Sequence, residues 1–366
     1  MKTNIRKTLR QQLSIAGIIF MASILSASSC SNNSIKMHTT VNSDGTCVRE
    51  ISYCNVLPQS YRDSVAEVKE EWLLKHIPER IDTGYFKRSE VKFVTSDSVI
   101  TTYIKEFSSV EQMCEEMPVK MTEKRHLKSH ASLTKKFKWF YTDYTFTEVF
   151  ESISDEFKHS VYEFLPKDEV EYWFTGQPNL VQGMNGAEAA SETANIGGVV
   201  QMWLYFNGMY KYLEEFALPQ NYETIENPPV SRERFIELQD SLCKYIVSSA
   251  EELDKIDLKK CFREFFQSDA FSSQIDEDWK LSIAAQLMYG EMLELSVPYT
   301  LTMPGKIVDA GMGSCQSDTI HYPLTGERLV PHDYTITATS RVTNVWAYIV
   351  AILIVGIAIG SFVWKR

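Results

Sequence analysis

The chain lacks the short motifs by which many enzyme classes are recognised. It has no G-x-S-x-G, no P-loop, no G-x-G-x-x-G, no H-E-x-x-H and no C-x-x-C. These patterns position a nucleophile, hold phosphates or ligate zinc, so the sequence offers no motif for a serine hydrolase, a nucleotide-binding enzyme or a zinc protein. We therefore expect a non-enzymatic protein that uses no cofactor and no metal.

Glycine and proline are also scarce, with 16 and 12 residues among 366, while 44% of the residues are apolar. This composition excludes collagen-like, low-complexity and disordered chains, because so apolar a chain buries a core. The length is enough for one large domain or two ordinary ones.

Basic residues are outnumbered by acidic ones, 37 to 48, which gives a formal net charge of −11. The distribution along the chain is uneven. Four basic residues precede residue 31 and two follow residue 344, with no acidic residue in either segment, so residues 31–344 carry a net charge of −17. A body this acidic repels phosphate backbones, which argues against nucleic-acid binding.

Residues 1–29 have the three parts of a signal peptide: a basic stretch to Arg10, an apolar stretch from Leu13 to Leu25, and a run of small residues before Cys30. The apolar part is too short to cross a bilayer. Leu25-Ser26-Ala27-Ser28-Ser29-Cys30 resembles a bacterial lipobox, which predicts lipidation of Cys30. The alternative is ordinary cleavage near Ala27, which leaves Cys30 as a plain thiol.

The C-terminal end carries the longest apolar run. Val345 to Trp364 are twenty residues without a charge, and as a helix they would reach about 30 Å. Aromatic residues stand at both ends of this run, and Lys365-Arg366 follow it. We predict a transmembrane helix in the bacterial cytoplasmic (inner) membrane, with the C-terminus in the cytoplasm and residues 31–344 outside.

Within this helix, Gly356 and Gly360 form a G-x-x-x-G pair. This spacing allows two helices to approach closely, which suggests a homodimer through the membrane helix. Because apolar helices are rich in small residues, chance is the alternative explanation.

The N-terminal half of the ectodomain, residues 31–150, has strand patterns. Alternating residues around Asp44-Gly45 predict a hairpin over 34–54, and helical spacing predicts a helix over 60–77. Further strands are expected at 90–95 and 99–107. A long strand is expected over 135–150, where aromatics on both faces predict a central, covered position.

The following region, residues 151–292, has mainly helical patterns, and strand patterns return in residues 293–343. Helices are expected at 197–217, 231–253, 257–267 and 275–293, and strands at 293–302, 305–310, 318–323 and 333–343. We predict an α+β fold in which the N- and C-terminal strands of the ectodomain build one sheet and residues 151–292 form a helical insertion.

Three short segments carry a family resemblance. Asp44-Gly45 in an early hairpin, the segment Leu301–Gly311, and strands ending at Ile336–Ser340 before a terminal membrane helix resemble the LppM-like lipid-anchored bacterial proteins. The resemblance covers about a quarter of the chain. It implies an α+β ectodomain with a C-terminal span and a role in lipid handling, and it implies no catalytic residues.

Six cysteines follow Cys30, and an even number in an exported chain allows disulfides. Cys243 and Cys261 lie on successive predicted helices and could pair. Cys47 and Cys54 are seven apart on one strand, so they point to opposite faces and cannot bond each other unless the strand breaks between them. The alternative is that all six are buried thiols.

Other candidate chemistry has a simpler interpretation in each case. His126 and His130 share a helical ligand spacing, but Arg125 and Lys128 beside them favour a solvated basic surface. Ser132-Leu133-Thr134-Lys135 matches the S-x-x-K spacing of serine acylases but enters a predicted strand. Acidic clusters such as 276–278 are typical of exposed helices rather than of acid–base pairs.

Aromatic residues gather in two places, at 137–150 and between Trp203 and Tyr212. They could line a lipid or glycan groove, but core packing is the preferred interpretation.

These observations favour a membrane-anchored bacterial envelope lipoprotein that is non-enzymatic and binds a lipid or another envelope protein. Membrane lipids and an envelope protein are the expected partners. One alternative is an envelope hydrolase whose residues meet only in the folded chain. Another is a structural component of an inner-membrane assembly.

Overall fold

The computed structural model describes residues 33–56, 87–95, 98–122, 125–249, 256–272, 274–275, 289–290 and 292–364. The chain divides into two compact units, one made of Ser31–Ser152 with Leu295–Arg366, the other containing Ile153–Glu294. The described part has two sheets in the first unit and seven helices, which confirms an α+β fold.

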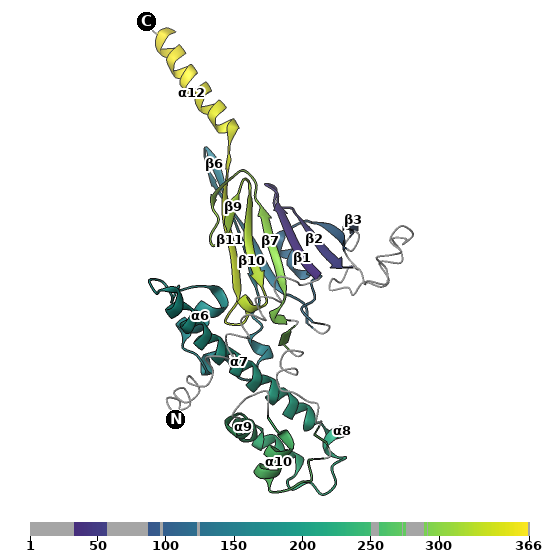
Figure 1. Ribbon diagram of the computed structural model, residues 1–366. Helices are drawn as coiled ribbons and strands as arrows, with labels where there is room; N and C mark the ends of the chain where they lie inside the picture. The colour runs from purple at the N-terminus through teal and green to yellow at the C-terminus, as the bar shows by residue number, and fades with distance from the viewer. Residues whose placement is uncertain are drawn as a thin grey trace. The chain divides into compact units, whose positions relative to one another are not determined.

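The first unit contains a seven-stranded sheet with the strand order β3-β4-β2-β1-β7-β10-β9 (Figure 1). Its strands are β1 (Asn33–Val41), β2 (Cys47–Val56), β3 (Lys87–Thr95), β4 (Ser98–Phe107), β7 (Ser296–Thr302), β9 (Ser314–Gln316) and β10 (Thr319–Thr325). β1 pairs parallel with β7, so strands from both ends of the ectodomain meet at the centre of the sheet.

The turn between β1 and β2 confirms the expected hairpin. Gly45 has a φ of 105°, and the Thr46 amide donates a 2.9 Å hydrogen bond to Asp44 Oδ1. Glycine adopts this left-handed conformation without strain, and an aspartate at the turn bonds the backbone that follows it.

A second sheet of four strands has the order β5-β6-β11-β8, where one sheet was expected. Its strands are β5 (Ser129–Lys138), β6 (Tyr141–Phe150), β8 (Lys306–Asp309) and β11 (Tyr334–Thr343). The expected strand over 135–150 is wrong, because the chain reverses at Trp139-Phe140 to form the β5–β6 hairpin. The aromatic residues that were expected on both faces of one strand therefore belong to two strands and the turn between them.

The core of this unit lies where side chains of the two sheets meet. Met37 and Ile51 from the larger sheet, and Phe146 and Phe150 from the smaller, are fully buried, and the rings of Phe150 and Tyr299 lie 6.0 Å apart. The short helix α5 (Val110–Glu115) adds buried Val110 and Met113, and its first turn is capped by the Ser109 hydroxyl. Apolar burial of this kind stabilises the unit.

The second unit is helical, as the sequence pattern indicates. It contains α6 (Lys167–Thr175), α7 (Gly186–Phe216), α8 (Pro219–Tyr222), α9 (Arg232–Ser249) and α10 (Leu258–Phe266). Asn185 and Glu188 form a capping box at the start of α7, and Ser231 Oγ accepts the Arg234 amide at the start of α9. Phe216, Phe235, Phe262 and Phe271 pack ring on ring in the core of this unit.

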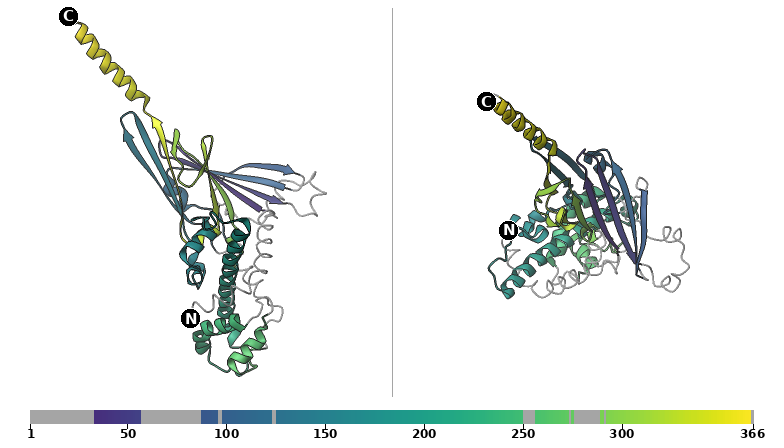
Figure 2. Two further views of the ribbon diagram at one scale, coloured as in Figure 1. Left: turned by 60° about the vertical axis from the view of Figure 1, so that its left-hand side comes forward. Right: turned by 90° about the horizontal axis from the view of Figure 1, so that it is seen from above.

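The last helix, α12 (Val345–Trp364), continues directly from β11 (Figure 2). The side chain of Phe362 in α12 lies outside the described part of the chain. Among the described residues, no helix is both long enough and apolar enough to cross a membrane.

The connection from β7 to β8 depends on Gly305. This residue has a φ of 78°, and an added Cβ would lie 2.3 Å from the Arg341 carbonyl oxygen of β11. We expect Gly305→Ala to weaken the β8–β11 pairing by about 1–3 kcal/mol, because it combines backbone strain with a clash against a neighbouring strand.

Hydrogen exchange of the β8 and β11 amides measures this effect, with faster exchange expected in the variant. Gly186→Ala, at the first residue of α7 where an added Cβ meets nothing within 4 Å, serves as the matched control. Unchanged β8 and β11 protection in Gly305→Ala would contradict the prediction.

Candidate functional site

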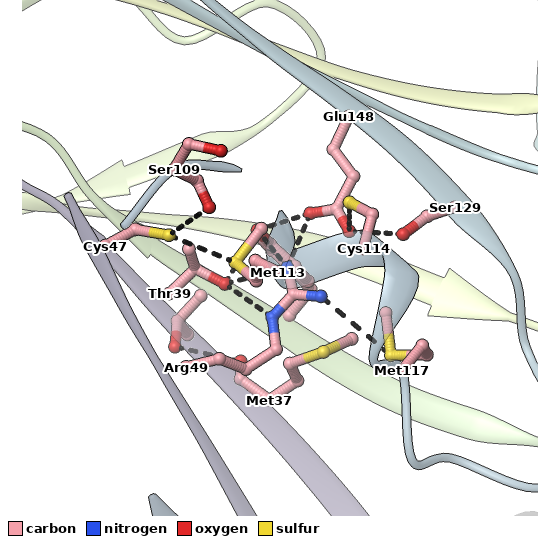
Figure 3. Close-up of polar contacts among 12 residues, drawn as sticks. Met37, Thr39, Cys47, Arg49, Ser109, Met113, Cys114, Met117, Ser129 and Glu148 are labelled. Carbon is pink, nitrogen blue, oxygen red and sulfur yellow. Dashed lines mark hydrogen bonds and ion pairs between the residues drawn. The ribbon is translucent and has the colours of Figure 1, made fainter. Parts of the chain in front are cut away.

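A charged pair is buried between the two sheets. Arg49 extends from β2 of the larger sheet and Glu148 from β6 of the smaller sheet, and both side chains have zero exposure (Figure 3). Arg49 Nη2 donates to Glu148 Oε2 over 2.7 Å. An unpaired charge in this position would be strongly unfavourable, so the pair has to be complete for the two sheets to pack.

The surrounding side chains satisfy both carboxylate oxygens of Glu148. Oε2 also lies 2.8 Å from the Tyr299 hydroxyl, while Oε1 accepts a 2.7 Å hydrogen bond from Ser129 Oγ and a weaker one from Cys114 Sγ. Arg49 donates through Nε and Nη2 to Thr39 Oγ1 at 3.2 and 3.1 Å. The network therefore joins β1, β2, β5, β6, β7 and α5.

Sulfur atoms surround the same cluster (Figure 3). Cys47 Sγ lies 3.7 Å from Met113 Sδ, and Met117 Sδ lies 3.8 Å from Arg49 Nη1. Burial raises the pKa of Cys47 to about 11 and that of Cys114 to about 12. Both thiols are therefore protonated at neutral pH and are poor nucleophiles. The buried pair and its neighbours hold the two sheets together.

A second feature lies on the surface, at the turn of the β5–β6 hairpin. Phe137, Trp139 and Phe140 are exposed by 57%, 49% and 39%, although core packing was the preferred interpretation for aromatics in this segment. They contact the first turn of α12. The rings of Phe137 and Trp139 lie 6.3 and 5.5 Å from that of Trp346, and Phe140 lies 4.8 Å from Tyr348. We call these five residues the aromatic collar.

Asn344, the residue before α12, fixes the collar in place. Its backbone N–H donates to the Phe140 carbonyl at 2.9 Å, and its side-chain amide donates to the Trp139 carbonyl at 3.1 Å. The Thr142 hydroxyl donates to Asn344 Oδ1 at 3.2 Å. These bonds satisfy turn carbonyls and join the hairpin to the start of the helix, so the five rings form one surface.

Basic side chains adjoin the collar on the same sheet. Lys138 Nζ and Arg341 Nε both contact the carboxylate of Asp143, at 3.1 and 2.6 Å. The hydrogen bond from Arg341 is the main cause that lowers the pKa of Asp143. The Arg341 guanidinium also lies 3.8 Å from the centre of the Tyr141 ring. A cation over a ring at this distance is favourable and holds the guanidinium in place.

Comparison with protein-family models, curated proteins and solved structures finds no match. The two features must therefore be interpreted from their own chemistry.

Several predicted site residues have a defined place in the structure, while the signal peptide (1–29) and Cys30 lie outside the described residues. Cys243 and Cys261 are free thiols buried in the core of the helical unit, with no disulfide between them. An added Cβ at Gly356 or Gly360 would meet nothing within 4 Å, so the G-x-x-x-G face is open in this chain.

The remaining motifs do not assemble a site. Ser132 and Lys135 both lie on β5, three residues apart, so they point to opposite faces of the sheet. His130 lies on the same strand and contacts Glu151 at 3.0 Å. Among the described residues, no group of three histidine, cysteine or acidic side chains is arranged to hold a metal ion.

Sequence reasoning missed both surface and interior features. The Arg49–Glu148 pair has a sequence separation of 99 and no motif, so only the alternation of β2 and β6 could have placed both residues on inward faces. The sequence did contain a signal for the aromatic collar. Trp139-Phe140 separates two segments of alternating residues, which is the pattern of two strands joined by a turn. Trp203, Tyr205, Phe206 and Tyr210, by contrast, are buried as expected.

We expect Glu148→Gln to destabilise the two-sheet unit by about 3–5 kcal/mol, because it leaves the Arg49 charge buried without a counter-charge. The measurement is the free energy of opening obtained from hydrogen exchange of β2 and β6 amides. Glu237→Gln removes the partner of Arg234 in an exposed pair and serves as the control, with an expected change below about 0.5 kcal/mol. Similar effects of the two substitutions would rule out a dominant role for the buried pair.

Proposed function

We propose that this chain is a non-enzymatic, membrane-anchored protein of the bacterial envelope whose two-sheet unit binds a lipid or another envelope protein beside the bilayer. The observation that carries the proposal is the aromatic collar at the base of α12. Tryptophan and tyrosine rings favour the boundary between lipid headgroups and hydrocarbon, where one side of the ring is apolar and the other is hydrated.

The side chains of α12 support a lipid environment. Ile352 and Ile357 are each exposed by 71%, and Leu353 and Ile359 by about 60%. Water around so much apolar surface is unfavourable, and contact with lipid hydrocarbon removes that cost. With α12 in the bilayer, the collar would lie at headgroup depth, and the two-sheet unit would be held at the membrane surface.

The remaining parts of the proposal follow from the sequence. A signal peptide would place the acidic unit outside the cytoplasm, and a lipid on Cys30 would add a second anchor. Gly356 and Gly360 would let two copies of α12 pair in the inner membrane. A non-enzymatic role is supported by the protonated thiols and by the complete burial of the Arg49–Glu148 pair, which substrate cannot reach.

The collar predicts the depth of two tryptophans in a bilayer. With the full chain reconstituted in vesicles whose phospholipids carry bromine near the headgroup end of the acyl chains, we expect bromine to quench part of the tryptophan fluorescence. Trp139→Phe and Trp346→Phe should each reduce the quenched fraction, because each removes an emitter at that depth.

Trp173→Phe is the matched control. Trp173 packs near Gly197 of α7 in the helical unit, so its replacement should leave the quenched fraction unchanged or raise it. If the full chain fails to float with vesicles, or if Trp139 and Trp346 are not quenched, the proposed membrane-anchored function is wrong.

A further inference from the structure

Four charged residues lie in one row across the four-stranded sheet. Lys136 of β5 is paired in register with Asp143 of β6, Asp143 with Arg341 of β11, and Arg341 with Lys306 of β8. Residues directly opposite each other in neighbouring strands project from the same face. The row therefore places three cations and one anion side by side, and Lys138, two residues after Lys136, projects from the same face.

This face is the outer one of the sheet. Along β6, Tyr144, Phe146, Glu148 and Phe150 are buried toward the core, so the odd-numbered residues that alternate with them project outward. Lys136 and Lys306 are exposed, and the side chains of Lys138 and Arg341 are 42% and 39% exposed. The cations can therefore reach a ligand in solution or at a membrane surface.

The charges on this face do not cancel. Asp143 is shared by Lys138 and Arg341, and Asp309 of β8 lies in the neighbouring row, opposite Thr339. Two carboxylates thus face four cations. The Asp309 carboxylate accepts the Gly311 amide at 2.9 Å, which further reduces its availability to the lysines. A local positive charge results on a body whose net charge is −17.

The row lies next to the aromatic collar. Lys138 precedes Trp139, and Arg341 lies three residues before Asn344, which is bonded to the hairpin turn. If the collar rests at the headgroup boundary, the cations stand one to three residues along the strands from the hairpin turn, at the level of lipid phosphates. Lysine and arginine at this level attract anionic lipids.

We infer that Lys136, Lys138, Arg341 and Lys306 form a binding surface for the headgroups of anionic phospholipids in the bilayer that holds α12. This inference rests on the proposed membrane-anchored function and names the lipid class. Arg341 and Lys138 are preorganised by Asp143 and by the Tyr141 ring, which lies 3.8 and 5.2 Å from their charged ends. Lys136 and Lys306 flank them and supply mobile charge to neighbouring phosphates.

The test uses the full chain reconstituted in bilayers containing equal amounts of phosphatidylglycerol and phosphatidylcholine. After gentle extraction into detergent, mass spectrometry measures the ratio of the two lipids that stay bound. We expect the wild type to retain phosphatidylglycerol preferentially and Lys136→Gln with Lys306→Gln to lower this preference by roughly fivefold for each lysine removed. These substitutions leave the contacts of Asp143 with Lys138 and Arg341 in place. High salt should weaken the wild-type preference, since exposed charges are screened.

The control is Lys211→Gln with Lys260→Gln, which removes two exposed lysines of the helical unit and changes net charge equally. An unchanged lipid ratio in the control supports the inference. Equal retention of both lipids by the wild type, an equal loss in the control, or displacement of phosphatidylglycerol by an acidic protein partner would each overturn it. Flotation with vesicles reports the anchoring separately, so failure of headgroup selection is distinguishable from failure of the proposed function.

Discussion

The arrangement of the two-sheet unit depends on one buried ion pair, Arg49 with Glu148. The two residues come from different sheets, and each is deprived of water. Any displacement of one sheet along the other would separate their charges in an apolar interior, at a cost of several kcal/mol. Hydrophobic contacts alone tolerate small shifts of this kind, because methyl groups accept many neighbours. The pair therefore sets which residues of the two sheets face each other.

The pair also explains how the surface features are positioned. Glu148 lies on β6, whose other end forms the β5–β6 turn with the exposed rings, and the same β6 pairs with β11, which leads into α12. A strand held at one end by buried hydrogen bonds gives a defined position to residues at its other end, because extended backbone is stiff over a few residues. The buried ion pair thus helps to fix the positions of the aromatic collar and of the charged row formed by Lys136, Asp143, Arg341 and Lys306.

The local patterns in the sequence predicted most helices and strands. They could not predict which strands pair or which distant segments come into contact. Asp44-Gly45 predicts a hairpin from turn chemistry alone, and Ser231 predicts a helix start from capping. One sheet could not be told from two, since the alternation of a strand does not identify its partner. Phe137, Trp139 and Phe140 were assigned to a covered strand because hydrophobicity was taken to mean burial. They lie at and beside a hairpin turn, and the helix that they contact is more than 200 residues away in the chain, so the local pattern could not place them.

Under the proposed membrane anchoring, the charge distribution would give the two-sheet unit an orientation that neither anchor could supply alone. A net charge of −17 over residues 31–344 would repel an anionic bilayer surface at most points of contact. The outer face near the collar is the exception, because Lys136, Lys138, Arg341 and Lys306 outnumber the carboxylates there. A tether fixes only the distance of a domain from the membrane. In the proposed arrangement, repulsion of the acidic surfaces and attraction at one basic end would together select which end faces the lipid. The hydrogen bonds of Asn344 join that end to α12.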